Sequence, residues 1–254
     1  MKLKPTLLLL IIALLSSCAT EAPKGRTFAE GLYREAEDLA KDKRYLMAIE
    51  KLGLLRSRYP YSFYATQAEL LLADIYFLQE NYEQAAQAYI FFKDFHPKHK
   101  KTSYIISKIA ESFFRQLPKT FDRDLSLGRL AVQYYREVVQ KYGRTKYAKS
   151  AKEKIALLEK MFDQKEKYIA DFYFKTKVYM AAKYRYDQML KTVKDNRIRF
   201  HAMERVIESS YLLEEYEKCA FYINRYFSKL DRSAKARLQK TRDRCLSKKL
   251  RKSG

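Results

Sequence analysis

The sequence predicts an all-α protein in which about five pairs of amphipathic helices follow one another along the chain. Glycine and proline are scarce, at 6 and 5 of 254 residues, which favours long uninterrupted helices. The 22 tyrosines and 15 phenylalanines provide large side chains for packing one helix against the next. Internal repetition is the third observation, because small and aromatic residues return at a fixed spacing.

The repetition is most complete in the two segments that begin near residue 28. Aligned on alanine, these segments share Ala36, Tyr45, Ala48, Leu52 and Pro60 in the first, and Ala73, Tyr82, Ala85, Tyr89 and Pro97 in the second. Equivalent residues are 37 positions apart. Small residues let two helices approach closely, and a proline ends the second helix because it has no N–H to donate. We expect Ser62 to cap the helix after Pro60.

Three further segments match the pattern in part. A fourth contains Ala170, Tyr179, Ala182 and Tyr186, a fifth contains Tyr216 and Cys219, and a looser third contains Ala110, Ala131 and Tyr135. About nine extra residues, Leu117–Leu125, interrupt the third, and unbroken helical spacing over Thr145–Lys167 predicts one long helix that continues past Ala170. The unit resembles the tetratricopeptide repeat. The sequence therefore predicts a tetratricopeptide-repeat superhelix, with an unrelated helical bundle as the alternative.

The first eighteen residues predict an exported, lipid-anchored chain. Two lysines precede the apolar run Leu7–Leu15, which is too short to span a bilayer. The sequence Leu15-Ser16-Ser17-Cys18 follows and resembles the bacterial lipobox, in which the cysteine thiol takes a diacylglycerol and the chain is cut before it. We predict Cys18 as the lipidation site, with an ordinary signal peptide as the alternative. By the same resemblance, Ala19 rather than aspartate favours the outer membrane.

This interpretation divides the chain into four ranges. They are a lipoprotein signal peptide at 1–17, a lipidated linker at 18–27, a repeat solenoid at 28–232 and a basic tail at 233–254. From Lys235 onward the tail has nine lysines or arginines and one aspartate, a charge of +8. We expect either a solvated, disordered end or a polybasic clamp for an anionic lipid or a partner protein.

The balance of charges predicts an anionic partner or surface. The net charge of +22 falls to +20 when the two lysines of the signal leave. An exported chain rarely meets nucleic acid, so we predict no nucleic-acid partner. Phospholipid headgroups, lipopolysaccharide or an acidic protein face fit better.

Two cysteines lie near the C-terminus. Cys219 falls on a small, buried position of the fifth repeat, so we expect it and Cys245 to be reduced thiols. A disulfide between them is the alternative, because the predicted compartment is oxidising.

Residue types that commonly act in catalysis or bind metals form no recognisable pattern in this sequence. The three histidines, His96, His99 and His201, have no metal-ligand spacing with cysteine or carboxylate residues, and lysines surround the first two. The sequence contains no phosphate-binding glycine loop and no nucleophile elbow. We predict no enzyme, no metal and no cofactor. Solenoids of this kind bind extended peptides or helices instead.

Three segments resemble one family of tetratricopeptide lipoproteins. They are Arg58-Tyr59-Pro60-Tyr61-Ser62-Phe63-Tyr64-Ala65, Asp122-Arg123-Asp124 before a helix, and Tyr168-Ile169-Ala170-Asp171-Phe172-Tyr173. In this order, over about residues 28–228 and after a lipobox, they resemble the BamD family of the β-barrel assembly machinery. The insertion in the third repeat and the long helix before the fourth also match that family.

The resemblance implies a scaffold at the periplasmic face of the outer membrane that works with a β-barrel insertase, accessory lipoproteins and unfolded outer-membrane proteins. It implies that Tyr59, Tyr61 and Tyr64 lie near the site for the aromatic terminus of a client, although Tyr59 or Tyr64 could instead brace the turn. Arg185 matches an arginine near the contact with the POTRA domains of the insertase. Tyr184 stands where the family has asparagine, and Gly143 replaces a proline, so we expect a left-handed glycine cap there.

Other functions fit parts of this pattern. A secretin pilotin or a regulator of cell-wall synthesis would share the anchor and the fold, but would not explain the ordered segments. A peptidoglycan-bound enzyme would need an acid/base pair in a cleft, which we do not find. A nucleic-acid binder is suggested by charge alone.

Overall fold

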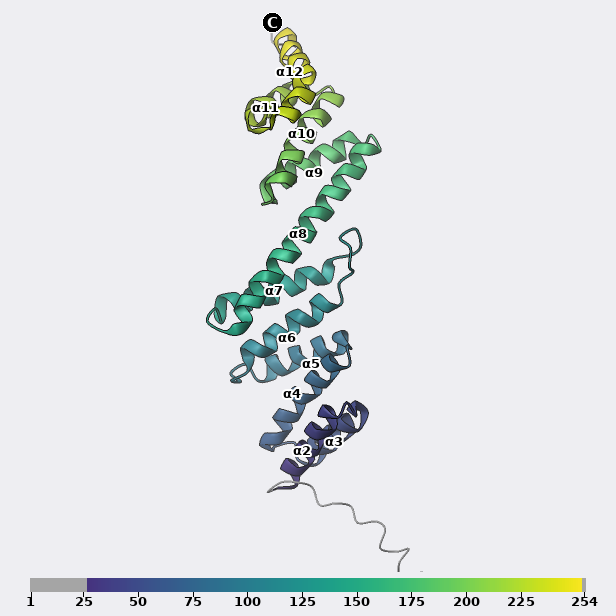
Figure 1. Cartoon of the computed structure of the whole chain (residues 1–254), viewed down its shortest axis with the longest axis vertical. Coiled ribbons are helices and arrows are strands. Elements are labelled where there is room, and N and C mark those ends of the chain that lie inside the picture. Colours follow the sequence, from purple (N-terminus) through teal and green to yellow (C-terminus); the bar gives the residue numbers. More distant parts are fainter. Residues whose placement is uncertain (1–26, 253–254) are drawn as a thin grey trace, which may run out of the picture. The chain divides into compact units, whose positions relative to one another are not determined.

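The structure is a computed structural model, and it describes residues 27–252. These residues form eleven α-helices and one short 3-10 turn, with no strand among them, as Figure 1 shows. This confirms the predicted all-α class. The chain forms two compact units, and each unit is described by itself: residues 27–99 of the first and residues 100–252 of the second.

The first unit consists of two helix pairs. Its helices are α2 (Phe28–Lys41), α3 (Tyr45–Arg58), α4 (Phe63–Leu78) and α5 (Tyr82–Phe95). The repeat alanines Ala36, Ala48, Ala73 and Ala85 are fully buried between the helices of each pair. Ser62 caps α4 as expected, because its Oγ accepts a hydrogen bond of 3.1 Å from the Ala65 N–H.

The second unit contains the other three pairs and one more helix. Its elements are α6 (Thr102–Arg115), α7 (Ser126–Lys141), α8 (Lys146–Lys175), α9 (Tyr179–Thr192), α10 (Asn196–Leu212), α11 (Tyr216–Tyr226), the 3-10 turn η1 (Phe227–Lys229) and α12 (Arg232–Lys252). Its repeat alanines Ala110, Ala131, Ala170 and Ala182 are also fully buried. The alanine alignment therefore identified helix contacts correctly in both units.

The turn inside four of the pairs has the same backbone geometry. Lys43, Glu80, Lys177 and Glu214 have positive φ angles of 58–63°. In each turn the next residue donates its N–H to a carbonyl five residues earlier, for example Arg44 to Leu39 at 2.8 Å. This is the Schellman motif, in which a left-handed residue satisfies the carbonyls at the end of a helix. Glycine normally occupies that position, so its absence hid these turns from the sequence analysis.

A buried tyrosine joins the two helices of three pairs. Tyr89 donates to Asp74 at 2.5 Å, Tyr135 to Glu111 at 2.7 Å and Tyr186 to Asp171 at 2.7 Å. In each case the carboxylate follows the buried alanine of the first helix by one residue. Burial and the nearby carboxylate raise the pKa of Tyr135 and Tyr186 well above the usual value, so both hydroxyls remain donors.

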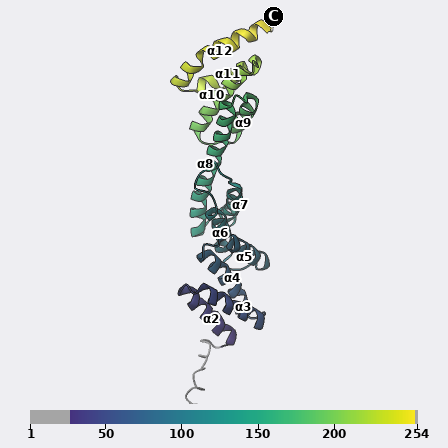
Figure 2. The same ribbon diagram turned by 90° about the vertical axis from the view of Figure 1, so that its right-hand side faces the viewer.

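The predicted long helix is α8, a single helix of 30 residues (Figure 2). Its first half packs with α6 and α7 through Ala148, Ala151 and Leu158. Its last turns pack with α9 and α10 through Ala170. The second unit therefore has two hydrophobic cores on one continuous helix.

Two expectations are corrected by the structure. Gly143 does not have a left-handed backbone; instead the Tyr142 N–H bonds to the Val138 carbonyl at 2.9 Å and ends α7. Cys219 and Cys245 form a disulfide rather than two reduced thiols. The burial of Cys219 was predicted correctly. The bond was missed because Cys245 reaches Cys219 only through the packing of α12 on α11, which the sequence does not reveal.

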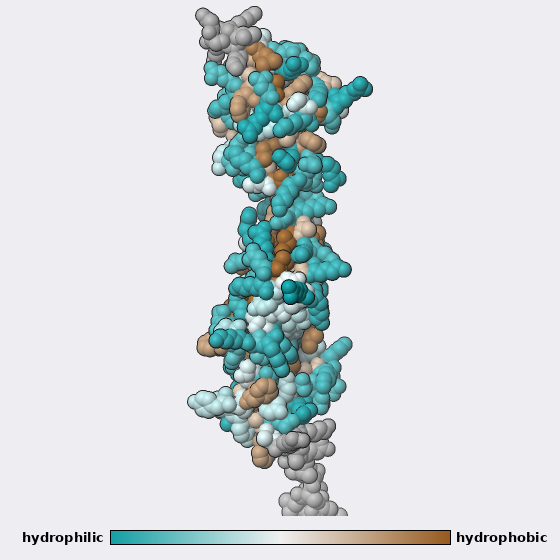
Figure 3. All heavy atoms as spheres, turned by 90° about the vertical axis from the view of Figure 1, so that its left-hand side faces the viewer, coloured by the Kyte–Doolittle hydropathy of each residue, from teal (hydrophilic) through white to brown (hydrophobic). Residues whose placement is uncertain are grey.

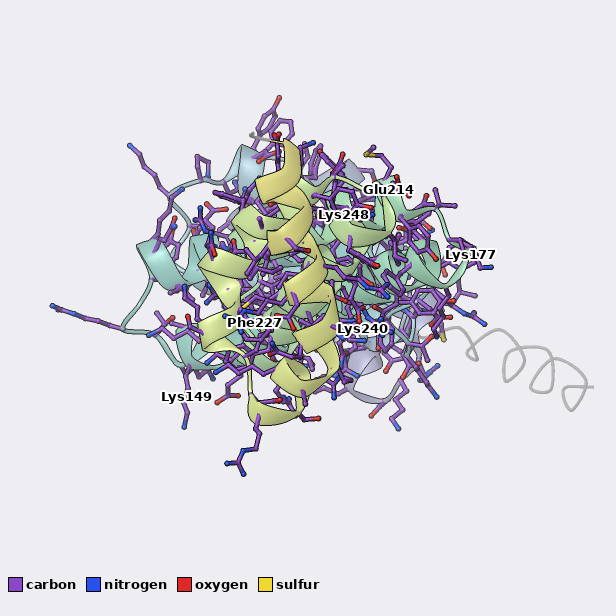
Figure 4. The ribbon with its side chains drawn as sticks, turned by 90° about the horizontal axis from the view of Figure 1, so that it is seen from above. Lys149, Lys177, Glu214, Phe227, Lys240 and Lys248 are labelled. Carbon is purple, nitrogen blue, oxygen red and sulfur yellow. A yellow bond between two sulfur atoms is a disulfide. The ribbon has the colours of Figure 1, made fainter. Side chains whose placement is uncertain are left out.

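The C-terminal segment is helical over Arg232–Lys252, so a disordered end is excluded for these residues. Leu238 and Cys245 are fully buried, because α12 packs on α10 and α11. Figure 4 looks onto this helix and shows Phe227 and Lys240 on either side of it. Within the described residues, no helix is long and apolar enough to cross a membrane.

Candidate protein-binding surfaces

The turn between α3 and α4 presents the first group of predicted binding residues. Tyr61 is fully exposed in this turn, and the neighbouring Phe63 is also exposed at the start of α4. The sequence analysis did not select Phe63, although it lies within the segment Arg58–Ala65. The turn therefore offers two aromatic side chains to a partner.

Tyr59 and Tyr64 contribute to the packing of the same turn. Tyr64 packs against the core of the first unit, with its ring 5.6 Å from that of Tyr33 and 5.5 Å from that of Phe63. Tyr59 is half-buried at the end of α3, and its carbonyl accepts a hydrogen bond of 3.1 Å from the Ser62 N–H. Of the three predicted tyrosines, Tyr61 alone is exposed without packing, which makes it the clearest candidate for contact with a ligand.

Arg185 lies on α9 in the second unit. Its guanidinium donates to the Glu166 carboxylate of α8 at 3.0 Å and lies over the Tyr173 ring, 5.7 Å from the ring centroid. These contacts fix a half-buried guanidinium with one edge toward solvent. Glu166 also lines a pocket of about 340 Å³ together with Phe162, Met189 and Val193. Its ion-pair partner thus holds Arg185 beside a pocket whose walls are partly apolar and partly charged.

Two of the segments that carry the family resemblance meet in the second unit. Phe121, next to Asp122 in the loop between α6 and α7, packs against Tyr168 of α8 with ring centroids 6.2 Å apart. Lys165 of α8 donates to the Arg123 carbonyl of that loop at 2.5 Å. Figure 1 shows this loop beside the middle of α8. The nine-residue insertion therefore builds a surface with α8.

Asp171 of α8 organises the other side of that surface. Its carboxylate accepts hydrogen bonds from His201 of α10 at 2.6 Å, from Tyr186 of α9 at 2.7 Å and from Lys167 of α8 at 2.5 Å. Burial raises the pKa of Asp171, but these hydrogen bonds outweigh burial and hold the pKa well below its usual range. The carboxylate is therefore ionised and joins three helices.

A pocket of about 410 Å³ lies between this network and the loop. Its lining residues are Phe121, Gln164, Lys167, Tyr168, Asp171, Phe172 and Lys175. The sequence analysis quoted several of these residues as part of a family segment but did not predict a pocket. Their helical spacing along α8 was the available signal, and the contribution of Phe121 depends on a contact between distant segments.

Several basic side chains of the C-terminal tail make contacts within the second unit. Arg237 pairs with Glu204 at 2.7 Å, Arg244 donates to the Tyr211 hydroxyl at 2.7 Å, and Lys248 donates to the Tyr216 hydroxyl at 2.7 Å. These contacts tie α12 to α10 and α11. The predicted polybasic clamp remains a prediction.

On the face shown in Figure 3, hydrophobic residues appear as small areas among hydrophilic ones. Residues 27–252 contain no group of three side chains arranged to hold a metal ion. Cys18, the predicted lipidation site, lies outside the described residues.

Successive helix pairs packed through buried alanines define a fold of the tetratricopeptide type. The family model YfiO, described as an outer membrane lipoprotein, matches residues 27–220. The chain belongs to this family of outer membrane lipoproteins, which includes BamD.

Curated relatives carry the name outer membrane protein assembly factor BamD. The protein of Neisseria gonorrhoeae is 28% identical over 199 residues, which is 72% of this chain and 74% of the relative. That of Rickettsia prowazekii is 29% identical over 191 residues, 75% and 76% of the two chains. That of Vibrio cholerae is 26% identical over 188 residues, 70% and 78% of the two chains.

Proposed function

We propose that this protein is a non-catalytic scaffold of the outer-membrane β-barrel assembly complex, bound to the periplasmic face of the membrane through a lipid on Cys18. It binds the POTRA region of the β-barrel insertase and receives unfolded outer-membrane proteins, alongside accessory lipoproteins. The observation that carries the proposal is the family match over residues 27–220, which includes the predicted client-binding and insertase-binding residues but neither the lipidation site nor the basic tail.

The two candidate surfaces fit different ligands. The turn around Tyr61 offers exposed aromatic rings, which suit the apolar side chains of an unfolded client. Arg185 offers a fixed cation beside a pocket with both apolar and charged walls, which suits a folded partner that presents a carboxylate. We therefore assign client binding to Tyr61, with Tyr59 and Tyr64 as supporting residues, and insertase binding to Arg185.

Replacing Arg185 with glutamate is expected to weaken binding to the purified POTRA region of the insertase by about tenfold or more. The substitution removes the cation and leaves two carboxylates, those of residues 185 and 166, side by side. Because partly exposed ion pairs contribute at most about 1 kcal/mol to stability, the variant should remain folded. Isothermal titration calorimetry of the lipid-free protein against the POTRA fragment measures the effect.

Lys149→Glu is the matched control for this change. Lys149 is an exposed lysine of α8 in the same unit, where Figure 4 labels it, and the substitution alters the net charge by the same amount. We expect this variant to bind normally. Equal affinities for Arg185→Glu and wild-type protein would place the insertase contact elsewhere.

Replacing Tyr61 with alanine is expected to weaken the binding of client peptides about three- to tenfold and to leave Tm unchanged, because the ring packs against nothing. Tyr64→Ala should lower Tm, because that ring packs on the core of the first unit. Fluorescence anisotropy with labelled peptides from an outer-membrane protein, combined with thermal melts, separates the two effects. Leu46→Ala, at another exposed apolar residue of the first unit, is the control. Unchanged affinity of the folded Tyr61→Ala variant would refute the assignment.

A further inference from the structure

Two segments of the second unit carry positive charges and no negative charge. Residues 100–108 and 141–148 contain six lysines or arginines and no aspartate or glutamate. The whole chain, by contrast, has 30 acidic residues beside its 52 basic ones. The first segment leads into α6, and the second contains the turn from α7 to α8. The positive charge of these segments is therefore not offset by acidic residues within them.

The fold brings the two segments together on one edge of the unit. The rings of Tyr104 in α6 and Tyr147 in α8 lie 5.9 Å apart. Lys108 lies over the first ring, with its Nζ 5.8 Å from the ring centroid, and Lys146 lies over the second at 5.3 Å. Figure 1 shows the start of α6 and the turn from α7 to α8 on the same side of the ribbon. The exposed cations of this surface, which we call the basic edge, are Lys100, Lys101, Arg144 and Lys146.

Three of these cations have no acidic partner in the fold. Lys100, Arg144 and Lys146 form no ion pair with any residue that the structure describes. Helices α6 and α8 both begin at this edge, and neither has an acidic residue in its first turn. Because the positive end of the helix dipole lies there, a cation at the start of a helix is unfavourable for stability. A partner outside the unit therefore explains the basic edge better than folding does.

The chemistry of the edge fits the anionic surface of a bilayer. Lysine carries a point charge on a flexible stem, and a fluid layer of lipid phosphates meets several such charges without a fixed geometry. Tyrosine suits the boundary between lipid and water, because its ring is apolar and its hydroxyl is polar. Lysine stems that lie along such rings extend their ammonium groups toward the headgroups. Arg185, by comparison, is held by Glu166 and Tyr173, which suits a folded partner.

We propose that the basic edge binds anionic phospholipid headgroups and orients the second unit against the membrane. The inference rests on one part of the proposed function, the lipid on Cys18 that keeps the chain at the membrane. One anchor near the N-terminus does not by itself fix how a unit that begins at Lys100 faces the bilayer. A basic patch is a common complement to an acyl anchor, because the two contacts together hold a protein to an anionic surface.

The first test measures binding to lipid without the anchor. The mature chain, residues 18–254, carries Cys18→Ser and is mixed with vesicles of phosphatidylcholine alone or of phosphatidylcholine and phosphatidylglycerol in equal parts. Co-sedimentation gives the partition coefficient. The protein should bind the anionic vesicles at least about tenfold more tightly than the neutral ones. This difference should shrink as the salt concentration rises, because salt screens exposed charges.

A variant without three of the cations tests the location. Lys100→Gln, Arg144→Gln and Lys146→Gln together should weaken binding to the anionic vesicles about tenfold or more. The Tm should change little, because all three side chains are exposed and lack an acidic partner. Lys100→Arg with Lys146→Arg retains the charge and should bind as wild type does, so a loss in the first variant is a loss of charge.

The matched control removes the same charge elsewhere in the second unit. Lys177→Gln, Lys191→Gln and Lys194→Gln replace three exposed lysines outside the basic edge. This variant has the same net charge as the one that lacks Lys100, Arg144 and Lys146. It should bind the anionic vesicles within about twofold of wild type.

The second test uses the lipidated protein, anchored in vesicles of the same two compositions. Lysine side chains are acetylated with a water-soluble succinimidyl ester and quantified by mass spectrometry. Lys100 and Lys146 should react at least about threefold more slowly in anionic than in neutral vesicles, because headgroups cover them. Lys177 and Lys191 should react equally in both.

The outcomes separate this inference from the proposed function. Equal loss of vesicle binding in the edge variant and its matched control would show that net charge alone drives adsorption, and would overturn the assignment. Wild-type protein without a preference for anionic vesicles would overturn it too, while insertase and client binding would stand. If the edge variant binds vesicles normally but loses affinity for the POTRA fragment, the edge binds protein rather than lipid. A chain without acylation at Cys18 would refute the proposed anchor, and the vesicle assay would still decide the role of the edge.

Discussion

Replacing Asp171 with asparagine is expected to destabilise the second unit by about 3 kcal/mol, because an amide cannot accept all the hydrogen bonds that this carboxylate accepts. His201 and Tyr186 share one carboxylate oxygen, and Lys167 bonds to the other. The substitution leaves the buried Tyr186 hydroxyl and the half-buried His201 imidazole without an anionic partner and uncouples α8 from α9 and α10. Thermal and urea unfolding of the lipid-free protein measure the loss, with Asp243→Asn, at an exposed aspartate of α12, as the control.

The pH dependence of this loss of stability tests whether the ionised carboxylate of Asp171 is its cause. The pKa of Asp171 is well below its usual range in the folded protein, so its stabilising contribution is present above the unfolded pKa of about 4 and is lost as the pH falls through the folded value. The difference in Tm between wild type and Asp171→Asn should therefore decrease as the pH falls below about 4. A difference that stays constant to pH 3 would show that the charge of Asp171 contributes nothing.

The helix pairs could be predicted from the sequence because the same helix–helix contacts recur in each repeat. The position of a buried alanine such as Ala36 or Ala170 needs a small residue in every repeat, because the facing helix leaves no room for a larger side chain. Because the repeats are regular, the two segments that differ from them were also recognised, namely the insertion at 117–125 and the long helix α8. Ser62 was predictable because a cap acts on its own helix and depends on local sequence only.

Features that depend on distant or backbone-specific contacts were not predictable. Four left-handed turns use lysine or glutamate, so the glycine that usually identifies such turns is missing. The pocket requires Phe121 and Tyr168, which are 47 residues apart, to face each other. Cys219 was correctly expected in a buried position, but burial does not reveal whether a second cysteine arrives from another helix. Only the packing of α12 on α11 shows that Cys245 is the cysteine that pairs with Cys219.

Removing the disulfide by Cys245→Ser is expected to lower the free energy of unfolding by about 3.5 kcal/mol, since the bond closes a loop of 26 residues in the unfolded chain. The loss should fall first on α12, because the disulfide, Leu238 and the contacts of Arg237, Arg244 and Lys248 help to hold this helix to α10 and α11. Hydrogen exchange should become faster across α12 and leave the first unit unchanged.

Reduction of the wild-type protein provides the independent test. Adding reductant should bring its Tm down to that of Cys245→Ser, while the variant should melt at the same temperature with and without reductant. Reduction and substitution both remove the constraint that the disulfide places on the unfolded chain. The variant should not respond to reductant because it has no such disulfide to reduce. If both Cys219 and Cys245 react with a maleimide in unreduced, denatured wild-type protein, the bond does not form. The expectation from the sequence that these two cysteines are reduced would then be correct.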